Sequence, residues 1–110
     1  MDFAYNDEQK EIIKVVRDLV EKEIVPYASE MDETGKLHEG LLEKLAAQGL
    51  LGVAIPEEFG GAGLDAITIA AIYEELGKGC AGVATTVAAN ALASYPVIIA
   101  GNDDQKKRYF

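Results

Sequence analysis

Residues 6–27, NDEQKEIIKVVRDLVEKEIVPY, carry the clearest helical pattern in the chain. Their apolar side chains recur every three or four positions, which places them on one face of a helix. Asn6 and Gln9 have the spacing of a capping box, with two acidic residues between them at the positive end of the helix. The stretch therefore predicts one long amphipathic helix, kinked at Pro26 and resuming until it stops before Gly35.

Helical patterns continue along the rest of the chain, separated by glycine and proline. Gly49 suits the end of the second helix as a left-handed residue, and Asp65 suits the start of the third as a cap. Pro96 disfavours helical geometry at Tyr95, so we expect one helix to end there and a short one to begin at Pro96. The expected helices cover residues 39–48, 65–79, 81–95, 96–100 and 102–110.

No run of alternating polar and apolar residues predicts a sheet. The sequence therefore indicates an all-α fold, an antiparallel helical bundle of five or six helices with short connections and no substantial sheet.

Length and charge limit the classes of function. The chain has 110 residues, with 10 Lys and Arg against 19 Asp and Glu, and a net charge of −9. A chain of this length forms one domain, and its acidic balance argues against nucleic-acid partners, which bind through Lys and Arg. We expect no membrane span, because charge, Asn or Pro interrupts each apolar stretch well before about 20 residues.

The absence of a targeting pattern and the single cysteine and histidine lead to expectations about cellular location and metal binding. Its first residues have no signal or transit pattern, so we expect a cytoplasmic protein. Cys80 is the single cysteine, which excludes an internal disulfide and fits burial as a small side chain. His38 is the single histidine, so we expect an exposed or capping imidazole and no metal site.

Residues 61–66, GAGLDA, match the spacing of a dinucleotide-binding loop. Five residues, two of them Glu, separate these glycines from the preceding apolar run, and no acidic ribose anchor follows about 20 residues later. We interpret the stretch as a tight loop between helices. No serine lies in a glycine-flanked elbow near a histidine, and no catalytic group is identifiable from the residues alone.

A face of small side chains stands out in the fourth helical segment. Ala84, Ala88, Ala91, Leu92 and Tyr95 share it at helical spacing, with Thr85 beside it. Small residues allow helices to pack closely. They also leave space for an apolar ligand between helices, and both readings stay open on this pattern.

Several motifs together resemble the N-terminal α-helical domain of acyl-CoA dehydrogenases. They include residues 24–28, IVPYA, residues 50–63, LLGVAIPEEFGGAG, and residues 99–109, IAGNDDQKKRY. The P-E-x-F-G-G-x-G loop and the G-x-x-x-Q-K-x-x-Y segment are specific in combination, about 40 residues apart, and the resemblance covers essentially the whole chain.

The resemblance implies an FAD-dependent enzyme that dehydrogenates the Cα–Cβ bond of acyl-CoA thioesters and passes electrons to an electron-transferring flavoprotein. Such enzymes are tetramers or dimers with an N-terminal helical domain, a middle β-domain and a C-terminal helical domain. Residues 1–110 would be the first of these, truncated near its C-terminal end, without the other two domains. No catalytic or flavin-binding residue can be transferred to this chain.

What the resemblance does transfer is the acyl pocket. It implies that Ala84, Thr85, Ala88 and Leu92 are substrate-binding residues, since the matching helix lines the fatty-acyl cavity of the family. Two alternatives remain: the same module in an acyl-CoA oxidase or related flavin monooxygenase, or a stand-alone helical module that binds another protein.

Overall fold

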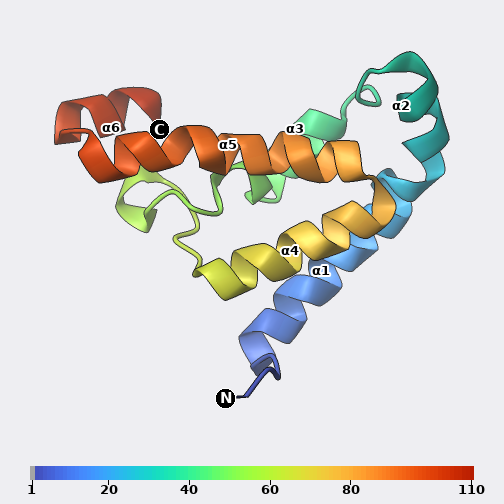
Figure 1. Ribbon diagram of the computed structural model, residues 1–110, viewed down its shortest axis with the longest axis horizontal. Coiled ribbons are helices and arrows are strands. Elements are labelled where there is room, and N and C mark those ends of the chain that lie inside the picture. Colours follow the sequence, from blue (N-terminus) through green and yellow to red (C-terminus); the bar gives the residue numbers. More distant parts are fainter. Residues whose placement is uncertain (1) are drawn as a thin grey trace.

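Residues 2–110 are described by a computed structural model, and they form helices joined by short loops (Figure 1). No strand occurs among these residues, which confirms the all-α prediction. The elements are α1 (Asp7–Glu23), η1 (Val25–Tyr27), α2 (Ala28–Thr34), α3 (Leu41–Ala47), η2 (Leu50–Gly52), η3 (Glu57–Phe59), α4 (Ala66–Gly79), α5 (Ala81–Ala100) and α6 (Asp103–Tyr109), where η marks a 3₁₀-helix.

Helix α1 begins with the predicted capping box. The Asn6 side chain accepts a hydrogen bond from the Gln9 amide at 2.8 Å, and the Gln9 side chain accepts one from the Asn6 amide at 3.0 Å. The Gln9 side chain is also buried and donates to Thr68 Oγ1 at 3.1 Å. One cap residue therefore fixes the start of α1 and ties it to α4.

A charged cluster fastens α1 to α4 farther along. Arg17 donates to the Glu75 carboxylate through Nε at 3.1 Å and Nη2 at 2.8 Å, and Lys78 Nζ donates at 2.8 Å. The Glu75 side chain is only 7% exposed. These bonds, chiefly the one from Arg17, lower the pKa of Glu75 to about 2 despite its burial. The carboxylate is therefore ionised and fully paired at neutral pH.

The helix stop before Gly35 agrees with the prediction, whereas the expected kink at Pro26 is an interruption between two separate helices. Helix α1 ends at Glu23, η1 contains Pro26, and α2 stops where Gly35 adopts a left-handed conformation with φ of +66°. Helix α3 begins at Leu41, two residues after the predicted Glu39. Gly40 causes this delay because its φ of +78° is left-handed and excludes it from a right-handed helix.

The predicted break at Tyr95 is wrong, because α5 continues through Pro96 to Ala100 as one helix of 20 residues. Proline inside a helix removes one backbone hydrogen bond, normally to the carbonyl four residues earlier. Here that residue is Leu92, which is 74% exposed. Gly101 then ends α5, and Asn102 starts α6 with a second capping box.

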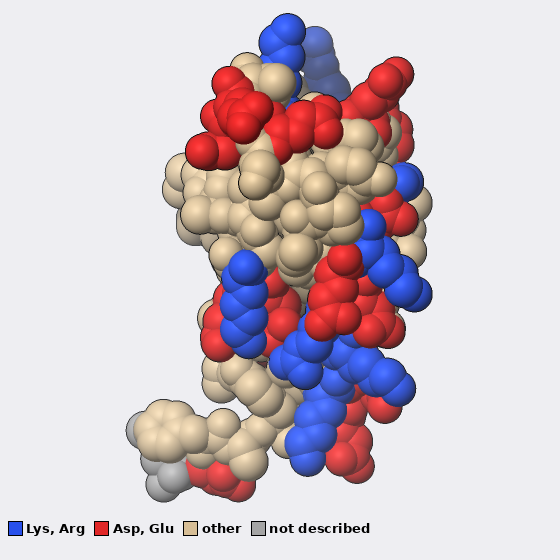
Figure 2. Space-filling view, turned by 90° about the vertical axis from the view of Figure 1, so that its right-hand side faces the viewer, with Lys and Arg blue, Asp and Glu red and all other residues tan. Residues whose placement is uncertain are grey.

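The core lies where α1, α4 and α5 meet the segment 41–53. Side chains that are at most 1% exposed mark its centre: Ile24, Leu41, Leu45, Ile72, Leu76, Val83 and Val87. Charge is distributed unevenly around it. Figure 2 shows a largely uncharged band between an upper end with acidic and some basic side chains and a lower region where acidic and basic side chains lie side by side.

The length of the uninterrupted helix α5 affects the prediction that the chain has no membrane span. It carries no charged residue, reaches a mean hydropathy of 1.5 over an 18-residue window, and has 17% of that window buried. By length and composition alone it could cross a bilayer, and a helix covered by another part of a protein satisfies the same criteria.

Candidate functional site

The glycine-rich loop is closed by its own backbone. Four consecutive amides donate to carbonyl oxygens within residues 52–56: Gly61 to Pro56 at 3.2 Å, Ala62 to Gly52 at 3.0 Å, Gly63 to Ile55 at 2.9 Å and Leu64 to Val53 at 2.9 Å. A Cβ at Gly61 would collide with the Ile55 backbone. The glycines thus permit close chain approach, and none of these four amides is free to hold a phosphate.

Helix α6 packs against this loop. The rings of Phe59 and Phe110 meet edge to face, with centroids 6.1 Å apart and planes at 62°, and Lys106 Nζ lies 5.9 Å from the Phe59 centroid. The two motifs that carry the family resemblance are therefore in contact. Sequence analysis did not predict this contact, because it depends on how α6 packs against the loop and not on the spacing within either motif.

The predicted substrate residues lie along one edge of α5. Ala84 and Ala88 are half-buried, whereas Thr85 and Leu92 are exposed. Ala84 faces α4, because a Cβ placed on Gly77 would lie 4.0 Å from the Ala84 Cβ. The Thr85 hydroxyl donates to the Ala81 carbonyl of its own helix at 2.9 Å. The edge therefore has two parts. Ala84 and Ala88 are half-buried in the domain, whereas Thr85 and Leu92 lie at its solvent-exposed surface.

Sequence reasoning missed a buried polar group on α4. The Tyr73 hydroxyl, on α4, is buried without a hydrogen-bond partner in the described chain. Burial raises the pKa of Tyr73, and the neighbouring Tyr95 adds to the effect. A helical pattern gives no information about the surroundings of this hydroxyl, which depend on how α4 packs.

The single histidine and the single cysteine, His38 and Cys80, do not belong to a metal-binding cluster in the described chain. His38 is half-buried and stacks on Tyr27, with ring centroids 3.6 Å apart, and its Nδ1 lies 3.5 Å from the Glu30 carboxylate. Cys80 is half-buried. Within residues 2–110, no three His, Cys, Asp or Glu side chains gather in a way that could hold a metal ion.

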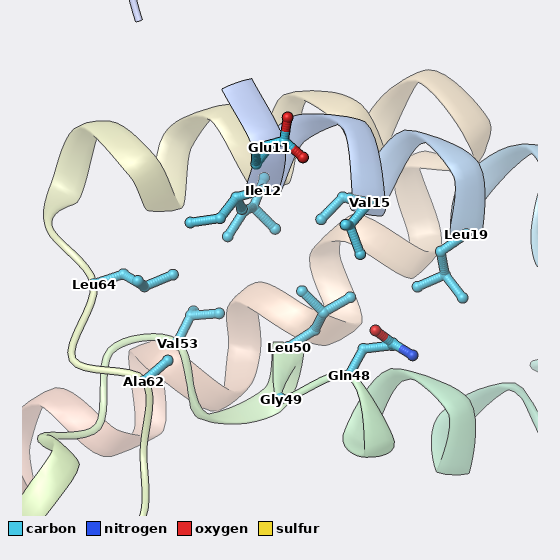
Figure 3. A pocket seen from close by; sticks show the side chains of 12 residues that line it. Glu11, Ile12, Val15, Leu19, Gln48, Gly49, Leu50, Val53, Ala62 and Leu64 are labelled. Carbon is cyan, nitrogen blue, oxygen red and sulfur yellow. The ribbon is translucent and has the colours of Figure 1, made fainter. Parts of the chain in front are cut away.

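An apolar groove of about 320 Å³ lies between α1 and the segment 48–64. Figure 3 shows Ile12, Val15 and Leu19 of α1 facing Val53 and Leu64 across it. Val15 is 52% exposed, although it belongs to a helix with an otherwise polar outer face. The remaining lining residues are Glu11, Val16, Gln48, Gly49, Leu50, Ala62 and Ile72. The available signal in the sequence was a second apolar row on this helix, Ile12, Val15 and Leu19, at spacings of three and four beside the core-facing row.

A second hollow, of about 260 Å³, continues this groove toward the start of α1. Both hollows are lined by Ile12, Ala62 and Leu64. The second is polar, and its other lining residues are Asn6, Glu8, Gln9, Glu57, Gly63, Asp65 and Thr68. The Thr68 amide lowers the pKa of Asp65, which caps α4.

Comparison with known proteins identifies the fold. The family model "Acyl-CoA dehydrogenase, N-terminal domain" matches residues 6–110. A probable acyl-CoA dehydrogenase of Bacillus subtilis, YngJ, is 36% identical over 110 residues, covering 99% of this chain and 29% of the relative.

Two solved structures agree over 99% of this chain. Butyryl-CoA dehydrogenase from Megasphaera elsdenii superposes with a TM-score of 0.87 at 33% identity, with 30% of its chain covered. A chain in the structure of the electron transferring flavoprotein of Acidaminococcus fermentans gives 0.91 at 32% identity, with 29% covered. The chain thus spans less than a third of the length of these relatives, and it belongs to the acyl-CoA dehydrogenase family as its N-terminal domain.

Proposed function

We propose that this chain is the N-terminal domain of an FAD-dependent enzyme that dehydrogenates acyl-CoA thioesters between Cα and Cβ. The observation that carries the proposal is the family match over residues 6–110, together with the fold shared with butyryl-CoA dehydrogenase. The domain supplies binding surfaces and not the reacting groups. We also propose a cytoplasmic protein that forms dimers or tetramers through its complete chain.

The flavin belongs to other parts of the parent enzyme. The family implies FAD, which accepts the hydrogens removed from the substrate. The residues described here do not fit its pyrophosphate, because the amides of residues 61–64 are already bonded to carbonyl oxygens of their own loop. We therefore assign no flavin contact and no chemical step to this chain.

The edge of α5 is proposed as one wall of the acyl cavity. Ala84 and Ala88 are small and half-buried, and Thr85 and Leu92 extend the same edge toward solvent. A cavity bounded by these side chains has room for a medium or longer acyl chain, since neither alanine projects beyond Cβ. The remaining walls would come from the parent's other domains, which would also cover the exposed surface of α5.

Ala88→Phe in the complete enzyme tests this wall. We expect the ratio of kcat/KM for octanoyl-CoA to that for butyryl-CoA to fall by about tenfold or more, because the ring fills the cavity. Ala89→Phe is the control, since it places the same ring one position along the same helix, outside the four residues of the proposed wall. An unchanged chain-length preference in Ala88→Phe would contradict the assignment.

The apolar groove is proposed as the docking site of the electron acceptor. Members of the family deliver electrons to a separate protein, and protein interfaces form around apolar side chains seated in pockets. The groove offers such a pocket, with half-exposed Val15 at its rim. It lies away from the four residues proposed for the acyl wall, none of which lines it.

Two assays of the complete enzyme separate docking from dehydrogenation. With purified electron-transferring flavoprotein as acceptor, Val15→Lys should lower kcat/KM by about tenfold, because it places a charge in an apolar pocket. With a small dye as acceptor, the rate should not change. Val25→Lys is a matched control, since Val25 is also 52% exposed but lies outside the groove. Fast flavin reoxidation by oxygen instead would favour the oxidase alternative.

A further inference from the structure

A separate hollow, of about 340 Å³, lies between α1 and α4, and we call it the basic hollow. Its apolar lining residues, Ile13 and Ala71, are buried. The other lining residues are Tyr5, Lys10, Lys14, Arg17, Glu74, Glu75 and Lys78. None of these residues lines the apolar groove and none belongs to α5, so the basic hollow is separate from both sites proposed above.

The basic hollow carries positive charge on an acidic domain. Four cationic side chains and two carboxylates line it, which leaves a net charge of +2, whereas the whole chain carries −9. Both carboxylates are already paired, Glu75 with Arg17 and Lys78, and Glu74 with Lys78. Lys10 and Lys14 form no ion pair within residues 2–110. The uncompensated charge of the hollow is therefore that of these two lysines.

Arg17 also has hydrogen-bonding capacity left. A guanidinium has five N–H groups, and Arg17 uses one on Nε and one on Nη2 to bind Glu75. This contact fixes the plane of the guanidinium, while the Arg17 side chain remains 52% exposed. Lys10, Lys14 and Arg17 follow at intervals of four and three residues, so they form one row about 10 Å long on α1. The hollow thus presents a row of cationic donors, one of which is held in place.

The surroundings of this row favour a compact anion over a long one. Beyond one end, Asp18 and Glu21 are near enough to Arg17 to favour its charged form. Beyond the other end, Asp7 and Glu8 occupy the first turn of α1. These acids would repel a nucleic acid or an acidic protein segment that extended past the row. A single carboxylate would compensate only one lysine, whereas a diphosphate has enough charge and acceptor oxygens to bind both.

We propose that the basic hollow binds a compact ligand through a diphosphate group held by Lys10, Lys14 and Arg17. The half-buried ring of Tyr5 lines the same hollow and offers an aromatic face to the base of a nucleotide. The diphosphate is therefore either a free ion or part of a nucleoside diphosphate, and both present the same oxygens to the row. This site requires neither acyl-CoA nor flavin, and so goes beyond the proposed dehydrogenation.

Isothermal titration calorimetry of the complete enzyme with inorganic pyrophosphate at low salt tests this site. The double variant Lys10→Gln/Lys14→Gln should raise the Kd by about tenfold or more, because it removes two charge-assisted contacts. The matched control Lys22→Gln/Lys107→Gln removes the same charge from exposed lysines outside the hollow and should change the Kd less than twofold. Equal Kd values for the two variants, or no binding of pyrophosphate to the wild type, would overturn the proposal.

A second variant gives a gain of binding, which misfolding cannot produce. Glu74→Gln removes an exposed carboxylate from the hollow and releases Lys78 from one ion pair. We expect it to lower the Kd for pyrophosphate by about threefold, since the anion then meets less repulsion. An unchanged or higher Kd would contradict a site that selects anions by the charge of this hollow.

Titrations with ADP and with a tetraglutamate peptide identify the class of ligand. If ADP binds more tightly than pyrophosphate and Tyr5→Ala removes the difference, the ligand is a nucleoside diphosphate. Equal Kd values for ADP and pyrophosphate assign the site to the diphosphate group alone. If tetraglutamate binds more tightly than either, the diphosphate is refuted and the hollow binds an acidic protein segment instead.

Discussion

The α1–α4 pair and helix α5 are stabilised in different ways. The pair is joined by buried polar contacts, Gln9 to Thr68 and Arg17 to Glu75, in addition to apolar packing. Helix α5 contributes Val83, Val87 and Ala91 to the core and forms no ion pair among those described. Leu92 and Ile99 on its outer surface are 74% and 82% exposed. Specific polar contacts thus define the fold at α1–α4, while α5 retains an apolar surface available for binding.

The largest change in stability is expected when a leucine of the α1–α4 pair is compared with a leucine of α5. Leu76→Ala in α4 should lower the free energy of unfolding by about 3 kcal/mol, because the side chain is fully buried and its removal leaves a cavity. Leu92→Ala in α5 should change it by less than about 0.5 kcal/mol. Urea unfolding followed by circular dichroism measures both. Equal losses would mean that the two helices contribute alike to the fold.

A smaller effect is expected from the buried carboxylate. The pKa of Glu75 is lowered from 4.5 to about 2, so the group stabilises the fold above pH 4.5, and this contribution is lost as the pH falls toward 2. We expect a loss of about 2 kcal/mol over that range. Glu75→Gln should lower stability at pH 7 and flatten the curve between pH 4.5 and 2.

The control for this variant is Glu74→Gln, one residue away. The Glu74 side chain is 64% exposed and pairs only with Lys78 at 3.6 Å, so its removal should cost less than about 0.5 kcal/mol. Similar pH curves for the two variants would show that the Arg17 contact does not carry the stability assigned to it.

The smallest effects concern the two capping boxes. Asn6→Ala should lower the free energy of unfolding by about 1 kcal/mol, since α1 is part of the central pair. Asn102→Ala removes the same motif from α6, which packs at the periphery against Phe59. We expect faster amide exchange in α6 with almost no change in global stability. A global loss from Asn102→Ala equal to that from Asn6→Ala would extend the cooperative unit to α6.

Local sequence signals predicted much of this fold. The capping box at Asn6, the helix stop before Gly35 and the left-handed Gly49 agree with the structure, because each depends only on neighbouring residues. Pro96 was misjudged for the same reason. Whether α5 continues through Pro96 is not decided by the residues next to it alone, and the structure shows that it does.

The candidate sites required tertiary information. The helical period grouped Ala84 and Ala88 on one face, but gave neither their half-burial nor the buried hydroxyl of Tyr73. The groove combines α1 with the segment 48–64, which are separated by more than 20 residues of sequence. Assigning substrate contacts to Thr85 and Leu92 still rests on family resemblance and stays a prediction.

The self-bonded loop at residues 52–64 has a consequence for recognition. Because its amides are held by its own carbonyls, Val53 and Leu64 keep their positions before any partner arrives. An unstructured loop would lose conformational entropy on binding, a cost that lowers affinity for each unit of surface buried. A segment that bound against this preorganised wall would therefore order little of the domain.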